Sequence, residues 1–436
     1  MKRVLIIAPD FTPSSLPPAT RVRFFAKHLP EFGWKPIILT VDPKHYEATV
    51  DLENEELLSP SLEVIRTGAF STRWTRKIGV GDIGMRSLWQ QWRAIRRSCR
   101  ERKIDLIFIP APPYVPMILG RLAHWRFGVP YVIDYIDPWV TEYYWKLPKA
   151  QRPPKWGASY WLARTLEPFA LKRVSHVTGV SKGTTDSVIN SYSWLVREQG
   201  TEIPYGAEAA DFDYVRQNPR RNSIFDPNDG LVHVSYVGAC IPAMYAAVRA
   251  VFQAVRAGLD RSPETFQRLR LHFVGTSYAA NGHAPQVVLM LAREAGIESL
   301  VDEHPGRIPY LTSLQVMVDS RGLLLIGSDE PHYTASKVFP YLLSERPLLA
   351  VFHEESSLVR ILGETSSGRV IRFNNRAAAA SRVNEIYEWF SEIASSRGNT
   401  SLSARAEAFG SYSVRTMTHK LASAFDQAVD GKFARD

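Results

Sequence analysis

The sequence predicts an α/β protein with two Rossmann-like, doubly wound domains, each a mostly parallel sheet covered by helices on both faces. Two series of short apolar runs alternate with amphipathic segments along the 436 residues. Continuous apolar runs separated by helical segments are typical of parallel strands that are buried on both faces. The chain is long enough for two domains of ordinary size, each with its own hydrophobic core.

The first domain is expected over residues 1–200 and the second over residues 201–412. The strands expected in the first domain are 4–8, 36–41, 62–66, 105–110, 131–134 and 176–180. The strands expected in the second are 232–237, 269–274, 323–326, 348–352 and 370–373. Residues 413–436 are expected to form a final helix, because apolar side chains recur there at helical spacing: Val414, Met417, Leu421, Phe425 and Val429.

The composition is that of a soluble globular protein, with 45% hydrophobic and 22% charged residues. The longest apolar stretch, 106–120, is interrupted by prolines, and the apolar run 4–8 is too short for a signal peptide. The two cysteines fit no metal or redox spacing, which favours a cytoplasmic location. None of the eleven histidines has the spacing of a ligand set, so no metal is expected.

The formal charge of +9 is unevenly distributed, since residues 1–200 carry a net charge of +11 and the rest a net charge of −2. This asymmetry suggests that the first half meets an anionic partner. No nucleic-acid recognition motif is present, so nucleic acid is not the expected partner. Residues 73–103 hold ten basic residues, two acidic ones and an apolar stripe. Such a segment fits an interfacial helix on an anionic membrane and equally a helix packed on the sheet.

Residues 335–352 (ASKVFPYLLSERPLLAVF) indicate a short helix, a turn and a buried strand. Lys337 opens the helix, where free N–H groups and the helix dipole favour an anion. A solvated surface lysine is the alternative interpretation. No Gly-x-Gly-x-x-Gly follows the first strand, which argues against a dinucleotide-dependent dehydrogenase.

This segment resembles the donor-binding helix of family-4-type glycosyltransferases (glycosyl transferases group 1) of the GT-B fold. The residues in register are Ser336, Lys337, Phe339, Tyr341, Leu342 and Pro347, whereas Pro340 and Glu345 stand where the family has glutamate and glycine. Further similar segments follow in order: 134–139 (DYIDPW), 203–208 (IPYGAE), 234–238 (VSYVG), 272–275 (HFVG) and 306–310 (GRIPY). The resemblance implies two domains facing a cleft, with the acceptor on the first, the donor on the second and the C-terminal helix returning to the first.

The resemblance also implies a set of site residues. The catalytic group comprises Asp137, which orients the acceptor hydroxyl, with Lys337 and Arg307 stabilising the leaving diphosphate. The expected donor contacts are Gly206, Gly238, Gly275, Ile308, Glu330, His332, Ser336, Val338 and Tyr341. The expected acceptor contacts are Ser15, Arg21 and Trp139. From the residues alone, Asp137 also fits a cap of the next turn, and Arg21 an ordinary surface arginine.

The implied function is the transfer of a sugar, with retention, from a nucleotide diphosphate sugar to a saccharide or lipid-linked acceptor in surface polysaccharide or glycoconjugate biosynthesis. The nucleotide sugar is a co-substrate and no cofactor is expected. The protein is expected in the cytoplasm, with a peripheral position on the inner face of the membrane as an option. Because His332 and Pro340 replace the family's two glutamates, a catalytically degenerate GT-B binding or assembly protein is one alternative. A nucleotide-sugar epimerase is another.

Overall fold

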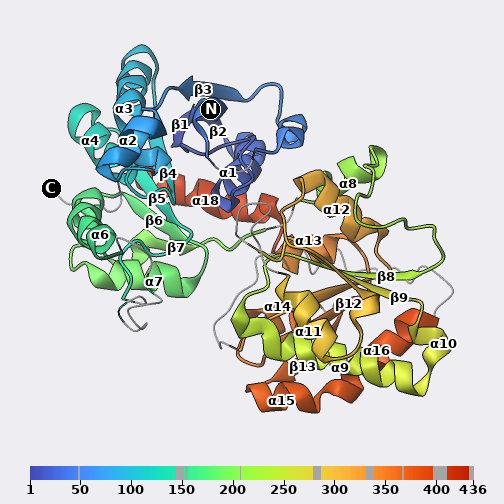
Figure 1. Cartoon of the computed structure of the whole chain (residues 1–436). Helices are drawn as coiled ribbons and strands as arrows, with labels where there is room; N and C mark the ends of the chain where they lie inside the picture. Colours follow the sequence, from blue (N-terminus) through green and yellow to red (C-terminus); the bar gives the residue numbers. More distant parts are fainter. Residues whose placement is uncertain are drawn as a thin grey trace. The chain divides into compact units, whose positions relative to one another are not determined.

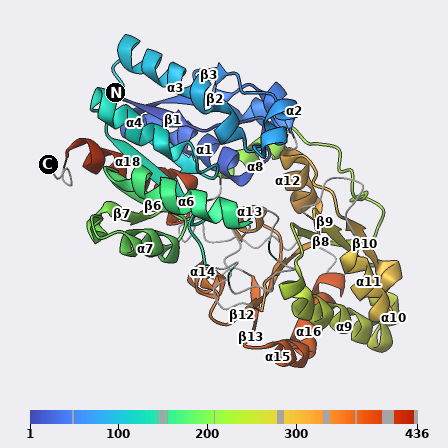
Figure 2. The same cartoon turned by 60° about the vertical axis from the view of Figure 1, so that its left-hand side comes forward.

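The computed structural model describes residues 1–47, 50–142, 145, 152, 156–206, 208–277, 286–329, 338–365, 368–395 and 410–431. The chain divides into two compact units (Figures 1 and 2). Unit 1 comprises Met1–Tyr205 and Val414–Asp436, and unit 2 comprises Gly206–Ser413. Each unit contains one parallel sheet flanked by helices, which confirms the predicted α/β class.

Unit 1 has a seven-stranded sheet in the order β3-β2-β1-β4-β5-β6-β7. Its strands are β1 (Lys2–Ile7), β2 (Trp34–Val41), β3 (Glu63–Thr67), β4 (Leu106–Ala111), β5 (Tyr131–Tyr135), β6 (His176–Gly179) and β7 (Gly200–Glu202). All neighbouring strands are parallel, and Val4 of β1 is in register with Pro36 on one side and Leu106 on the other. Strand β7 was not predicted, because three residues without a continuous apolar run give no strand signal.

Helices cover both faces of this sheet. They are α1 (Pro17–His28), α2 (Thr72–Thr75), α3 (Ile83–Glu101), α4 (Met117–Phe127), α6 (Trp156–Leu171), α7 (Lys182–Ser191) and α18 (Val414–Val429). Helices α1 and α18 enclose one apolar core with the sheet, and α3, α4, α6 and α7 enclose another. Helix α1 begins with two prolines, whose fixed φ suits the first helical turn.

The C-terminal helix α18 returns to unit 1, as predicted. Phe425 is fully buried, and its ring lies 5.3 Å from that of Trp34 and 5.2 Å from that of Phe108. Lys2 Nζ donates a hydrogen bond to Asp426 at 2.8 Å. Helix α18 therefore completes the hydrophobic core of unit 1, although it lies at the end of the chain.

Helix α3 shows how the basic segment packs. Ile95 is fully buried, and Leu88, Trp92 and Cys99 pack against the same core. Most of the predicted apolar stripe therefore packs on the sheet. Trp89 belongs to the same stripe and is 54% exposed.

Unit 2 has a six-stranded parallel sheet in the order β10-β9-β8-β11-β12-β13. Its strands are β8 (Val232–Val237), β9 (Leu269–Val274), β10 (Val301–His304), β11 (Gly322–Ile326), β12 (Leu348–His353) and β13 (Arg369–Phe373). Strand β10 was not predicted. It lies at the edge of the sheet, and its four residues alternate between buried and more exposed instead of forming a continuous apolar run.

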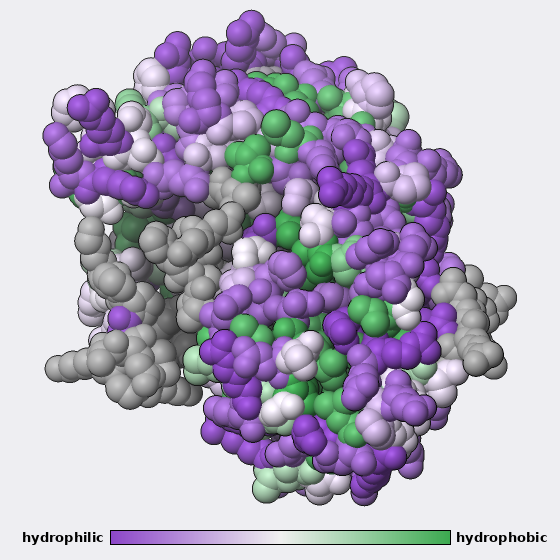
Figure 3. Space-filling model, turned by 45° about the vertical axis from the view of Figure 1, so that its right-hand side comes forward, coloured by the Kyte–Doolittle hydropathy of each residue, from purple (hydrophilic) through white to green (hydrophobic). Residues whose placement is uncertain are grey.

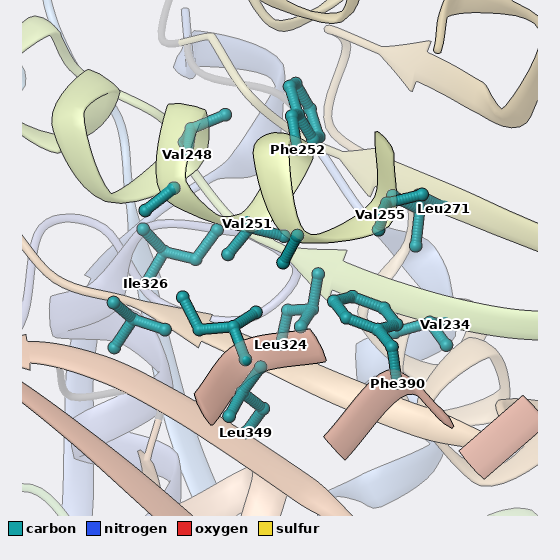
Figure 4. Packing of buried hydrophobic residues seen from close by; sticks show 14 of the residues in the cluster. Val234, Val248, Val251, Phe252, Val255, Leu271, Leu324, Ile326, Leu349 and Phe390 are labelled. Atoms are coloured by element: carbon teal, nitrogen blue, oxygen red, sulfur yellow. The ribbon is translucent and has the colours of Figure 1, made fainter. Parts of the chain in front are cut away.

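The helices of unit 2 are α8 (Ala209–Gln217), α9 (Tyr245–Arg261), α10 (Pro263–Phe266), α11 (Val287–Glu294), α12 (Tyr310–Asp319), α13 (Val338–Leu343), α14 (Ser357–Thr365), α15 (Arg376–Ser381) and α16 (Val383–Ser395). Helices α9 and α16 cover one face together, and Val251 of α9 lies close to Leu324 and Ile326 of β11 (Figure 4). Short 3-10 turns complete both units: Leu29–Phe32, Pro43–His45, Leu52–Leu57, Arg76–Ile78, Arg197–Gln199, Pro242–Met244 and Glu298–Leu300.

Among the described helices, none is long and apolar enough to cross a membrane. Hydrophilic side chains dominate the face of the molecule seen in Figure 3, and hydrophobic ones form small groups between them.

Candidate active site

The strand order of each unit indicates at which edge of the sheet a ligand is expected to bind. In unit 1 the chain reverses direction across the sheet between β1 and β4, and in unit 2 between β8 and β11. Ligands of open α/β sheets bind outside the carboxyl ends of the strands at such a point. Site residues are therefore expected just after the strands next to these points. In unit 1 these are the segments after β1, β4 and β5, and in unit 2 the segments after β8, β9 and β11.

Unit 1 contains a pocket of about 670 Å³ at this edge. Its lining comes from the start of α3, from the segments after β4 and β5, and from the first turns of α6. The lining residues are Asp82, Met85, Tyr114, Val115, Asp137, Pro138, Trp139, Thr141, Trp156, Ser159, Tyr160 and Leu162. The structure thus brings together two of the predicted site residues, Asp137 and Trp139.

The start of α3 is held close to the segment after β4. Asp82 caps the helix, since its carboxylate accepts a hydrogen bond from Met85 N at 2.9 Å. At Gly84 an added Cβ would lie 2.7 Å from Pro116 Cδ, so only glycine allows this close approach. The cap and the glycine together place the Asp82 carboxylate beside the segment that carries Tyr114.

The segment after β5 is fixed by its contacts with Tyr114. The Tyr114 and Trp139 rings are stacked, with centroids 5.4 Å apart and planes inclined by 7°. The Tyr114 hydroxyl donates a hydrogen bond to the backbone oxygen of Asp137 at 3.2 Å. Asp137 is exposed as a residue, but the pocket partly shields its carboxylate from water and raises its pKa. A cap of the next turn would accept a hydrogen bond from a backbone N–H, and among the described contacts the Asp137 carboxylate accepts none.

A further pair of acidic residues extends from the pocket to the end of β1. Burial raises the pKa of Asp82 above its ordinary value, although backbone N–H groups at the helix start oppose this. Asp10, only 8% exposed, has its pKa raised to about 6 by burial and then by the charge of Asp82, while Arg86 opposes the shift. The Arg86 guanidinium is itself held by three backbone carbonyls at 2.9 to 3.1 Å. Sequence reasoning missed Asp10 and Asp82, whose only local signals are the end of a strand and a helix cap.

The other predicted acceptor residues do not line the pocket. Ser15 is half-buried in the segment after β1. Arg21 is 2% exposed and forms a two-pronged ion pair with the fully buried Asp134, with distances of 2.7 and 3.1 Å. Arg21 also donates to Ile203 O at 2.7 Å. These partners account for a buried guanidinium without any ligand, so Arg21 is not the ordinary surface arginine considered above.

On the unit 2 sheet, the predicted glycines occupy strand ends. Gly238 follows β8 with φ 149° and Gly275 follows β9 with φ 72°, conformations that favour glycine. Gly238 N donates to Val274 O, and Gly275 N donates to His304 O, each at 2.7 Å. Their own N–H groups therefore continue the hydrogen bonding of the sheet.

Other predicted donor residues lie in the core or in segments next to the strand ends of unit 2. Tyr341 is fully buried, and its hydroxyl accepts a hydrogen bond from Val237 N at 2.6 Å, which fixes the end of β8. Val338 is fully buried in the core. Arg307 is exposed and Ile308 half-buried, and both lie between β10 and α12. Gly206 is half-buried at the start of unit 2.

The remaining predicted donor residues lie outside the described part of the chain: Glu330, His332, Ser336 and Lys337. Within the described residues, no group of three or more histidine, cysteine, aspartate or glutamate side chains could hold a metal ion.

Comparison with known proteins agrees with this architecture. Residues 18–206 match the family model described as a glycosyl transferase 4-like domain. No curated protein matches the chain by sequence.

Several solved structures share the fold across nearly the whole chain. HepE from Anabaena, solved with UDP and glucose, has a TM-score of 0.59 at 14% identity, covering 98% of this chain and 100% of its own. A glycosyltransferase from Rickettsia africae has a TM-score of 0.60 at 11% identity, with 98% of each chain covered. Sucrose-phosphate synthase from Thermosynechococcus elongatus has a TM-score of 0.57 at 15% identity, with 98% and 99% covered.

The matched domain and the shared fold agree with the resemblance seen in the sequence: residues 18–206 are similar to a glycosyl transferase 4-like domain, and the whole chain has the GT-B fold of these solved structures. The matched range 18–206 includes Asp137 and all the lining residues of the pocket.

Proposed function

We propose that the protein transfers a sugar, with retention of configuration, from a nucleotide diphosphate sugar to a saccharide or lipid-linked acceptor, in surface polysaccharide or glycoconjugate biosynthesis. The observation that carries the proposal is the pocket in the glycosyl transferase 4-like domain, where the Asp137 carboxylate lies beside the Trp139 and Tyr114 rings. A carboxylate beside aromatic faces suits a sugar, whose hydroxyls donate hydrogen bonds and whose ring packs on apolar surface.

The proposed roles follow from charge and position. Asp137 orients the acceptor hydroxyl in the pocket, and positioning of this kind lowers the barrier by holding reactants together. Arg307 and Lys337 stabilise the negative charge that develops on the leaving diphosphate. The reaction needs no cofactor or metal in this scheme, because the diphosphate itself takes up the acceptor proton.

The first donor to test is UDP-glucose, since HepE was solved with UDP and glucose. Thermal-shift titrations with UDP, GDP and ADP, followed by turnover of their glucose derivatives, identify the base. Binding of none of these nucleotides would contradict the proposal and favour a binding or assembly protein.

Replacing Arg307 with alanine should weaken nucleotide binding by about 1.5–3 kcal/mol, because one charge-assisted contact is lost. Arg249→Ala is the matched control, since Arg249 is an exposed arginine of α9 that pairs with Glu294. Equal nucleotide affinity in both variants would remove Arg307 from the donor site. Lys337→Ala should behave like the Arg307 variant.

We also propose that unit 1 lies on an anionic membrane on the cytoplasmic side. The exposed side of α3 supports this, because Trp89 is 54% exposed and the Arg93 guanidinium lies 4.7 Å from its ring. Arginines continue along the same helix at Arg96, Arg97 and Arg100. Each basic residue near an anionic surface contributes about 1 kcal/mol.

Sedimentation with anionic and neutral vesicles tests the membrane proposal. We expect binding to anionic vesicles alone, and a marked loss for the variant Trp89→Ala, Arg93→Gln. A control variant, Arg249→Gln on unit 2, should bind like the unchanged protein. Equal binding to both vesicle types, or to neither, would contradict the proposal.

A further inference from the structure

We propose that the pocket of unit 1 selects an acceptor sugar that carries no phosphate, either a neutral pyranose or an amino sugar. This inference rests on the proposed function and narrows the class of acceptor. It is carried by the charges and the aromatic rings of the pocket lining.

The described residues of the lining include two carboxylates and no cationic side chain. Asp82 enters from the start of α3 and Asp137 from the segment after β5. Asp10 adds a third acidic group behind Asp82. Arg86, the cation near this group, is 2% exposed and donates to the carbonyls of Gly81, Phe70 and His45 instead of pointing into the pocket.

A described cation on the α6 side, Arg152, is also engaged with protein groups. Arg152 lies over the rings of Trp145 and Trp156, at 5.5 Å from each centroid. It donates a hydrogen bond to Trp145 O at 3.0 Å. Arg152 thus stiffens the aromatic wall of the pocket without belonging to the lining.

Two pairs of aromatic rings belong to the lining. Tyr114 and Trp139 make one stacked pair, and Trp156 and Tyr160 make another pair with centroids 5.6 Å apart and planes inclined by 30°. Rings held in this way offer flat apolar surface that matches the C–H face of a pyranose. The carboxylates beside them accept hydrogen bonds from neighbouring sugar hydroxyls or from an ammonium group.

A phosphate group meets the opposite situation in this pocket. Its two negative charges would lie near two carboxylates, and like charges at this range repel each other. Rejection of a ligand by uncompensated like charge is a recognised source of specificity. The pocket therefore discriminates by charge as well as by shape.

Direct binding by the full-length protein tests the inference. The probes are methyl glycosides of glucose, galactose, mannose and glucosamine, each compared with the 6-phosphate of the same sugar by calorimetry and by tryptophan fluorescence. We expect at least one unphosphorylated glycoside to bind at least tenfold more tightly than its 6-phosphate. Tighter or equal binding of the phosphates, or no binding of any glycoside, would overturn the inference.

Two variants locate the effect. Asp82→Asn with Asp137→Asn keeps a capping side chain at the start of α3 and should reduce the preference against phosphate at least fivefold. Trp139→Ala should weaken binding of every sugar, whereas Trp125→Ala, an exposed tryptophan on α4 outside the lining, should leave binding unchanged. An unaltered preference in the double aspartate variant would also overturn the inference.

The outcomes distinguish this inference from the proposed function. Transfer from a nucleotide sugar to a phosphorylated acceptor would support the function and refute the inference. Binding of unphosphorylated glycosides without binding of any nucleotide would support the inference and refute the function.

Discussion

Replacing Asp10 with asparagine should stabilise unit 1 at neutral pH and leave its stability almost unchanged in acid. Asp10 is 8% exposed at the carboxyl end of β1, and its pKa is raised from 3.8 to about 6. Burial is the main cause, the charge of Asp82 adds to it, and Arg86 opposes it. The folded protein thus bears the cost of an ionised, shielded carboxylate once the pH exceeds about 6.

The sign and size of the effect follow from the two pKa values. Because the folded pKa is the higher one, the folded state binds the proton more tightly, and stability is greatest below about pH 4. Stability then falls as the pH rises through the folded pKa of about 6. A shift of about two units corresponds to roughly 3 kcal/mol. The Asp10→Asn variant cannot ionise, so its advantage over the unchanged protein should grow from about zero in acid to about 3 kcal/mol at neutral pH.

Urea unfolding followed by tryptophan fluorescence measures this advantage. Of the eleven tryptophans, all except Trp389 lie in unit 1, so the signal reports mainly on that unit. Asp226→Asn, a change at an exposed loop position of unit 2, is the control and should show no trend with pH. A difference between Asp10→Asn and the unchanged protein that stays constant between acid and neutral pH would refute the reasoning.

Two further predictions concern buried contacts. Arg21→Ala should destabilise unit 1 by about 3–5 kcal/mol, because Asp134 is left buried without its partner. In urea unfolding, adding Asp134→Asn to this variant should recover part of the lost stability. Fully additive losses of the two changes would contradict the prediction. Gly258→Ala should destabilise unit 2 by about 1–3 kcal/mol, because the added Cβ would lie 2.0 Å from Phe266. Gly363→Ala, in open space within α14, should instead raise stability by about 0.5–1 kcal/mol. Thermal unfolding followed by circular dichroism compares the two variants. Equal shifts of their unfolding temperatures would contradict the packing argument.

The sequence predicted the fold in detail because buried parallel strands leave a strong local signal. Each of the predicted strands overlaps an observed one, and the two missed strands are the short ones at sheet edges, β7 and β10. Strands at an edge need less apolar surface, so hydrophobic pattern detects them poorly. The final helix was also predictable, because its apolar stripe must be buried and α18 supplies the missing side of the first core.

The site was less predictable, because its residues come from separate segments that only the topology brings together. Asp137 and Trp139 were found through a motif, whereas Asp82 and Trp156 lie on α3 and α6 and carry no local sign of a shared pocket. The alternative interpretation of Arg21 as a surface arginine was wrong for the same reason. Its partner Asp134 is 113 positions away, on β5.

The first half of the sequence has a net positive charge, yet its pocket is lined by acidic residues. The basic and the acidic side chains lie on different surfaces of unit 1. Arg93, Arg97 and Arg100 of α3 are exposed, whereas Asp82 and Asp137 line the pocket. If an acceptor is lipid-linked, these arginines meet the anionic lipid while a sugar without phosphate enters the pocket. Salt should separate the two interactions, because exposed charges are screened over about 8–10 Å at physiological ionic strength and far less when buried. Raising the salt concentration should therefore release the protein from anionic vesicles while glycoside binding changes little. Parallel weakening of both interactions would show that the same charges serve both, and would contradict this division of unit 1.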